Sequence, residues 1–197
     1  MKKLIRGVIV LSLILLAGFA SGISTLISDN LLFYARVARL YAAEPPTHIS
    51  MPLPGVKKSQ IANTWQAPRG SSRRHQGQDI FAKRGTPIYS ATEGYVYRIG
   101  ENQLGGQTVT VIGAGGRVYY YAHLDSYADG LAEGDYVTPK TKLGSVGTTG
   151  NAQGTPPHLH FGVYTPTGAI NPLPLLAETT VPSPKSRVQA SKLATKL

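Results

Sequence analysis

Residues 158–163 read HLHFGV, and this stretch decides the fold class of the chain. Its alternation of polar and apolar residues is typical of a β-strand, in which successive side chains point to opposite faces. His158 and His160 therefore share one face, and Leu159, Phe161 and Val163 share the other, where we expect them to enter a hydrophobic core. Two neighbouring imidazoles on a strand suit a metal ligand with a catalytic partner beside it.

The composition favours a β protein and excludes any function that requires cysteine. The chain has 197 residues, enough for one domain of ordinary size plus appendages. Its 22 glycines and 11 tyrosines favour strands and turns over helices. Cysteine is absent, which excludes disulfides and thiolate ligands, so any metal must be bound by histidine and carboxylate. The net charge of +10 favours a polyanionic neighbour.

Short strand-like runs alternate with glycine-rich turns between about residue 61 and residue 176. They cover residues 87–90, 95–99, 108–112, 117–123, 136–137 and 158–164. Strands at this spacing without a strong helical period predict a small antiparallel β-sheet domain, so the fold class is mostly β. Residues 29–60 are expected to form a juxtamembrane helix and a linker rich in proline. Residues 177–197 are polar and basic, which predicts a disordered tail.

The N-terminal residues 1–28 are expected to be a membrane anchor or a signal sequence. Residues 7–27 carry no charge, and Lys2, Lys3 and Arg6 precede them. About 20 apolar residues span a bilayer as a helix, and the basic flank predicts a cytoplasmic N-terminus. We therefore expect a single transmembrane helix in the cytoplasmic membrane, with the remaining chain in the periplasm or another extracytoplasmic space. The alternative is secretion after cleavage near residues 18–20.

Two further segments carry chemistry. In residues 75–79, HQGQD, a histidine and an aspartate flank Gly77, which we expect to let the backbone turn so that both side chains reach one ion. His123 ends a strand-like run, and a period of two places it on the face of Tyr119 and Tyr121. A catalytic zinc takes about three ligands from histidine and carboxylate and leaves a fourth position for water. Two histidines would remain to handle protons.

Ordered motifs along residues 61–176 strengthen this hypothesis. The sequence contains HQGQDIFAKRGTPIYSATEGYV at 75–96, YYYAHL at 119–124, EGDYVTPKTKLGSVGTTG at 133–150, HLHF at 158–161 and INP at 170–172. In this order they resemble the lysostaphin-type, or LytM-domain, zinc endopeptidases of the bacterial cell wall. The resemblance covers neither the N-terminal segment nor the tail.

The resemblance implies one zinc ion per chain, bound by His75, Asp79 and His160. It implies that His123 and His158 orient or deprotonate the attacking water and stabilise the oxyanion. The family fold is a small antiparallel β-sheet domain whose groove carries the metal on its floor. Its members hydrolyse amide bonds in peptidoglycan stem peptides or cross-bridges through a metal-activated water.

Some residues depart from the family pattern, and other functions compete with hydrolysis. Gln78 stands where an apolar residue is usual, and Gly162 stands where a glutamate is common; both bear on the shape of the groove and hence on the bond cleaved. A non-catalytic LytM-like activator of another wall hydrolase is the alternative, although all five site positions are retained. A nucleic-acid partner is disfavoured, because no such motif is recognised and the charge is spread along the chain. No regulatory protein partner is identified by the sequence.

Overall fold

The computed structural model describes residues 31, 34–70 and 72–177, and the chain divides into two units, residues 1–39 and 40–197. In the first unit residues 34–39 are helical, and in the second residues 40–42 are helical. The expected membrane helix at 7–27 and the expected tail at 178–197 lie outside the described residues. Among the residues that are described, no helix is long and apolar enough to cross a membrane.

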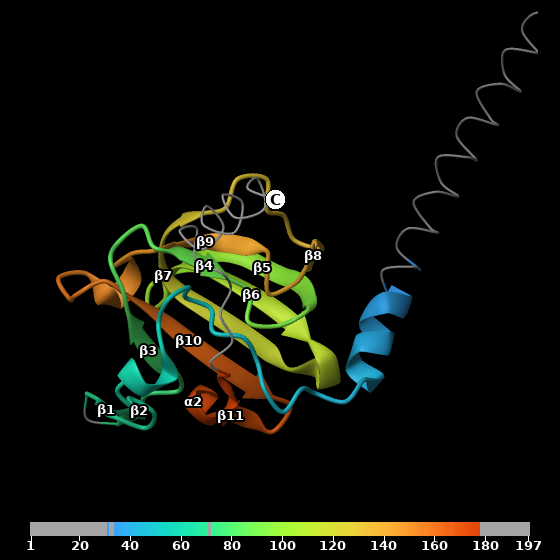
Figure 1. The fold of residues 1–197 in the computed structure, drawn as a ribbon, viewed down its shortest axis with the longest axis horizontal. Helices are drawn as coiled ribbons and strands as arrows, with labels where there is room; N and C mark the ends of the chain where they lie inside the picture. The colour runs from blue at the N-terminus through green and yellow to red at the C-terminus, as the bar shows by residue number, and fades with distance from the viewer. Residues whose placement is uncertain (1–30, 32–33, 71, 178–197) are drawn as a thin grey trace, which may run out of the picture. The chain divides into compact units, whose positions relative to one another are not determined.

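The second unit is built on an antiparallel sheet that has nine strands within the described residues (Figure 1). They are β3 (Gln78–Phe81), β4 (Pro87–Tyr89), β5 (Gly94–Asn102), β6 (Gly106–Gly113), β7 (Val118–Tyr127), β8 (Tyr136–Val137), β9 (Lys142–Val146), β10 (His158–Thr165) and β11 (Gly168–Ile170). The predicted mostly-β antiparallel fold is confirmed. The other elements are a hairpin of β1 (Pro68–Arg69) and β2 (Arg73–Arg74), the 3-10 turns η1 (Lys58–Gln60), η2 (Ala114–Gly116) and η3 (Gly150–Ala152), and the short helix α2 (Pro172–Leu175).

Strand β10 is central to the arrangement of the site. It pairs with β7 on one side and with β3 and then β11 on the other (Figure 1). His160 lies directly opposite Asp79 of β3 and opposite Ala122 of β7. Directly opposed residues in an antiparallel pair project from the same face with their Cβ atoms about 5 Å apart, so this register alone brings Asp79 and His160 together.

The core lies under the opposite face of β10. Leu159, Phe161 and Val163 are fully buried, as the period of two predicted. Strands β6, β7 and β9 add buried aliphatic and aromatic side chains to the same cluster. The cluster also includes Ile49 and Leu53 from the segment that we expected to be a linker, and Ile49 forms a parallel bridge with Leu176. Packed structure therefore begins before residue 61.

Strand β7 contains an irregularity that the period of two does not predict. Tyr119 and Tyr121 enter the core, but His123 has a positive φ of 63°, and Leu124 joins the core instead. Two backbone hydrogen bonds hold His123: its N–H donates to the Gly105 carbonyl at 2.7 Å, and its carbonyl accepts another backbone N–H. The predicted face of His123 is thus wrong, because one residue in the left-handed region shifts the alternation by one.

Candidate metal centre

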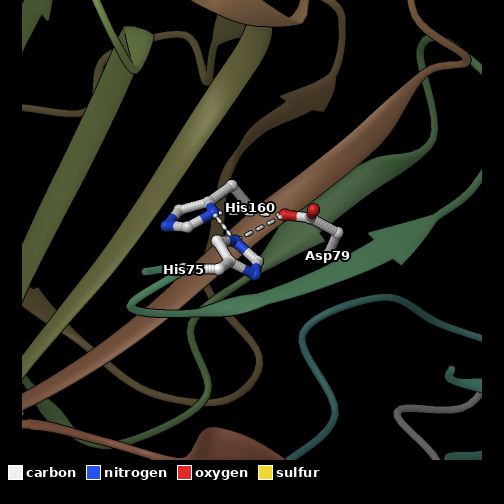
Figure 2. A group of neighbouring side chains, drawn as sticks. All are labelled: His75, Asp79 and His160. Carbon is white, nitrogen blue, oxygen red and sulfur yellow. Dashed lines mark hydrogen bonds and ion pairs between the residues drawn. The ribbon is translucent and has the colours of Figure 1, made fainter. Parts of the chain in front are cut away.

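His75, Asp79 and His160 bring three potential ligand atoms to one point (Figure 2). His75 Nε2 lies 3.1 Å from Asp79 Oδ1, and His160 Nδ1 lies 3.2 Å from the same oxygen. The two imidazole nitrogens are 2.8 Å apart. His75 lies in the segment between β2 and β3, Asp79 lies on β3 and His160 lies opposite Asp79 on β10, so one pair of strands and the segment before it carry the group.

This triangle fits a tetrahedral divalent ion. Zinc binds histidine nitrogen and carboxylate oxygen at about 2.0–2.2 Å, so two ligands of a tetrahedral site are about 3.3–3.5 Å apart. The observed separations of 2.8–3.2 Å would need to open by only a few tenths of an ångström. Two imidazoles and one carboxylate also form a donor set that leaves a fourth position for water or substrate.

Thr64 orients two of the three potential ligands. His75 Nδ1 donates to the Thr64 carbonyl at 2.7 Å, which leaves the lone pair of Nε2 directed at the ion site. The Asp79 backbone N–H donates to Thr64 Oγ1 at 2.9 Å. No sequence motif indicates this residue, because it lies 11 and 15 positions before its partners in a segment without regular structure.

Gln78, where an apolar residue is usual in the family that the sequence resembles, hydrogen-bonds the segment around Thr64 to β3. Its side chain is fully buried, and its amide nitrogen donates to the Ala62 carbonyl and to Thr64 Oγ1. Its amide oxygen accepts the Thr64 N–H at 3.3 Å. A polar residue is therefore accommodated in an interior position because both ends of its amide are hydrogen-bonded.

The carboxylate of Asp79 is shared between the two imidazoles and an arginine. Oδ1 faces His75 and His160, whereas Oδ2 accepts from the guanidinium of Arg69 on β1. Burial by itself would raise the pKa of Asp79, but hydrogen bonds and charges from His160 and His75 outweigh burial and hold the pKa well below its usual range. Asp79 is therefore ionised at neutral pH, as a metal ligand must be.

His123 and His158 complete a group of four imidazoles. His123 Nδ1 donates to the Thr149 carbonyl at 2.9 Å, and His158 Nδ1 donates to the Pro156 carbonyl at 2.8 Å, so Nε2 of each ring keeps its lone pair. Their ring centroids are 4.9 Å apart, and His158 Nε2 lies 3.9 Å from Asp79 Oδ1. Burial, reinforced by the charge of His158, lowers the pKa of His123 to about 4. His123 is thus neutral at neutral pH and can accept a proton.

The five side chains singled out from the sequence lie around one groove of about 500 Å³. Tyr120 and Tyr164 also line it, whereas Tyr119 and Tyr121 are core residues. The remaining lining comes from the β1–β2 hairpin and the residue after His75, from the end of β5 and the turn before β6, from β7, and from η3 and the loop after it, namely Arg69, Arg73, Arg74, Gln76, Asn102, Leu104, Gly105, Ala122, Asn151, Ala152 and Thr155.

Comparison with known proteins gives matches over this domain. The model of peptidase family M23 matches residues 73–172, just over half of the chain. The L-Ala--D-Glu endopeptidase of Bacillus subtilis is 37% identical over 126 residues, which are 60% of this chain and 39% of that protein. Lysostaphin of Staphylococcus simulans is 30% identical over 135 residues, 61% of this chain and 27% of that protein. The chain thus spans about two fifths or less of the length of these relatives.

Solved structures share the fold. Helicobacter pylori Csd3 superposes with a TM-score of 0.55 at 30% identity, covering 76% of this chain and 39% of that one. The catalytic domain of lysostaphin from Staphylococcus simulans superposes with a TM-score of 0.52 at 28% identity, covering 59% of this chain and 92% of that one. The arrangement of strands around the groove is therefore that of the LytM-like fold.

Proposed function

The chain belongs to peptidase family M23, and from this premise we propose that it is a zinc-dependent endopeptidase that hydrolyses peptide bonds in peptidoglycan stem peptides or cross-bridges. The observation that carries the proposal is the triangle of His75, Asp79 and His160 ligand atoms, with His123 and His158 beside it. Peptidoglycan is proposed as substrate because a relative named a peptidoglycan DD-endopeptidase, ShyC of Vibrio cholerae, is 33% identical over 92 residues of this chain.

In this proposal His75, Asp79 and His160 hold the ion. Zinc bound there would supply Lewis acidity and would lower the pKa of water to about 7. Asp79 contributes a negative charge that stays ionised, and Thr64 fixes the tautomer of His75 so that Nε2 faces the ion. The ligand set therefore needs no proton rearrangement on His75 before it can bind a cation.

His123 and His158 move protons and stabilise charge. Both rings have Nδ1 tied to a backbone carbonyl, so each exchanges protons at Nε2. A neutral imidazole can take a proton from the attacking water and return it to the leaving amine. The protonated ring can also donate a hydrogen bond to the oxyanion that forms from the scissile carbonyl.

We also propose where the enzyme works. The uncharged stretch at residues 7–27 supports a single-pass anchor in the cytoplasmic membrane, with the peptidase domain outside the cytoplasm. Retention of the full chain in membranes after an alkaline wash would support this placement. Recovery of a shortened chain from the soluble extracytoplasmic fraction would favour cleavage and secretion instead.

Metal content and cleavage of purified sacculi test the proposal together. We expect the full chain to contain about one zinc ion and to release peptides, and we expect His160→Ala to lose both. His48→Ala is the matched control, since His48 is exposed and does not line the groove. Stoichiometric zinc in the unmodified chain without any released peptide would refute the proposed peptidase activity. It would favour a non-catalytic activator of another hydrolase.

A further inference from the structure

Two arginines of the groove have no partner in the described residues. Arg73 and Arg74 form β2, immediately before His75, and both line the groove while remaining exposed. Within the ranges that the structure describes, neither guanidinium makes an ion pair or a side-chain hydrogen bond. Arg69 on the adjacent strand differs from them, because its guanidinium is engaged by Asp79.

The described groove lining carries little negative charge to oppose these arginines. Asp79 is its only carboxylate, and that carboxylate is already shared by Arg69 and two imidazoles. The lining away from the hairpin consists of neutral side chains such as Asn102, Asn151 and Thr155. Positive charge is therefore concentrated on the hairpin side of the groove, and a bound divalent cation would add to it.

A carboxylate is the ligand that this charge distribution fits. Guanidinium groups bind carboxylates through paired, charge-assisted hydrogen bonds, and they keep their charge at all relevant pH values. A groove of about 500 Å³ accommodates a few peptide residues rather than the backbone of a long polyanion. Small acidic peptides therefore fit the site better than a nucleic acid does.

We infer that the groove selects peptides with a free carboxylate close to the scissile amide, and that Arg73 and Arg74 determine this specificity. The inference rests on the proposed function and narrows its substrate class. Stem peptides, which carry free carboxylates, are the substrates, in preference to uncharged glycine bridges. The two guanidinium groups bind substrate and transition state alike, so they act on KM rather than on kcat.

The test uses the full chain and two forms of one stem peptide, one with free carboxyl groups and one with these groups amidated. We expect kcat/KM of the wild type to be about tenfold higher for the free form. Each exposed charge pair contributes up to about fivefold, and the two arginines together form two such pairs. In the double variant Arg73→Gln, Arg74→Gln this preference falls to within about twofold, through KM. The matched control is Lys83→Gln, Arg98→Gln, which replaces two exposed cations that do not line the groove and should keep the preference.

Two results would overturn the inference: equal rates for the two peptides in the wild type, or an equal loss in the control variant, which would indicate general attraction of anions. Binding of both peptides to zinc-loaded His123→Ala, after its fold is checked by circular dichroism, provides a readout without turnover. Tighter binding of the free form that requires Arg73 and Arg74 supports the inference even if the wild type cleaves nothing. In that case the proposed hydrolysis is refuted, whereas the inference that Arg73 and Arg74 select free carboxylates stands.

Discussion

Replacing Gly77 by alanine tests how closely the metal site is packed. Gly77 does not have a positive φ, so an alanine there meets no backbone strain. A Cβ atom built on Gly77 would, however, lie 2.5 Å from His160 Cε1 and 2.7 Å from His160 Nε2. The glycine is needed because the imidazole of a proposed ligand lies directly against its backbone.

The size of the effect follows from these distances. Ordinary contact begins at 3.4 Å, so the His160 ring must retreat by about 0.9 Å. Metal–ligand bonds tolerate deviations of about 0.2 Å, so His160 Nδ1 can no longer bind together with His75 and Asp79. The ring can yield toward the groove, because 16% of its side chain is exposed. We therefore expect a zinc affinity lower by at least about tenfold, with a stability loss of only about 1–3 kcal/mol.

The assay is competition for zinc between the purified chain and a chromophoric chelator, combined with urea unfolding of the metal-free chain. Gly100→Ala is the matched control: Gly100 also lacks a positive φ, and its added Cβ would meet only Arg98 Nε at 3.8 Å. We expect this control to bind zinc like the wild type. If Gly77→Ala binds zinc within twofold of the wild type, His160 does not ligate the ion in the observed position.

Three other predictions follow from the same site. His123→Ala and His158→Ala should each abolish peptide release while zinc stays bound, whereas His75→Ala should lose both; release of zinc by His158→Ala would show that its role is misassigned. Because burial lowers the folded pKa of His123 to about 4 from an unfolded value of 6.5, the unfolded state binds more protons between these pH values, and the free energy of unfolding decreases as the pH is lowered through this range. Urea unfolding of the metal-free chain should show that the free energy of unfolding decreases from pH 7 to pH 4.5. This decrease should be about 2–3 kcal/mol smaller in His123→Gln than in the wild type. Gln78→Leu should reduce the free energy of unfolding by about 1–3 kcal/mol, because the Ala62 carbonyl and its neighbours lose their buried partner, and an unchanged urea midpoint would contradict this.

Alternation along β10 was predictable from the sequence, because it depends only on the period of a regular strand. Leu159, Phe161 and Val163 are buried, and His158 and His160 line the groove on the opposite face. The same rule failed at His123, since a single residue with positive φ moved it to the other face. Regular periods can be read from a sequence, whereas a local bulge depends on tertiary hydrogen bonds such as the one from His123 to Gly105.

Other features of the site could not be predicted because they join distant segments. Thr64 and Arg69 contact Asp79 from a segment and a hairpin that carry no motif of their own. Gly77 was expected to permit a turn, but its importance lies in the space that it leaves for His160, 83 positions later. The burial of Ile49 was likewise missed, because its surroundings are rich in proline and resemble a linker.

The register that places His160 opposite Asp79 has a consequence for how a groove of this fold can diversify. The spacing of these two groups is set by one directly opposed residue pair of β3 and β10, not by a loop. The hairpin of β1 and β2 supplies positively charged side chains to the lining of the groove but contributes no strand to the sheet that holds β3 and β10. We therefore expect that a hairpin of different charge at positions 73 and 74, with Arg69 kept on Asp79, would change the choice of peptide without changing the ion that the proposed site binds.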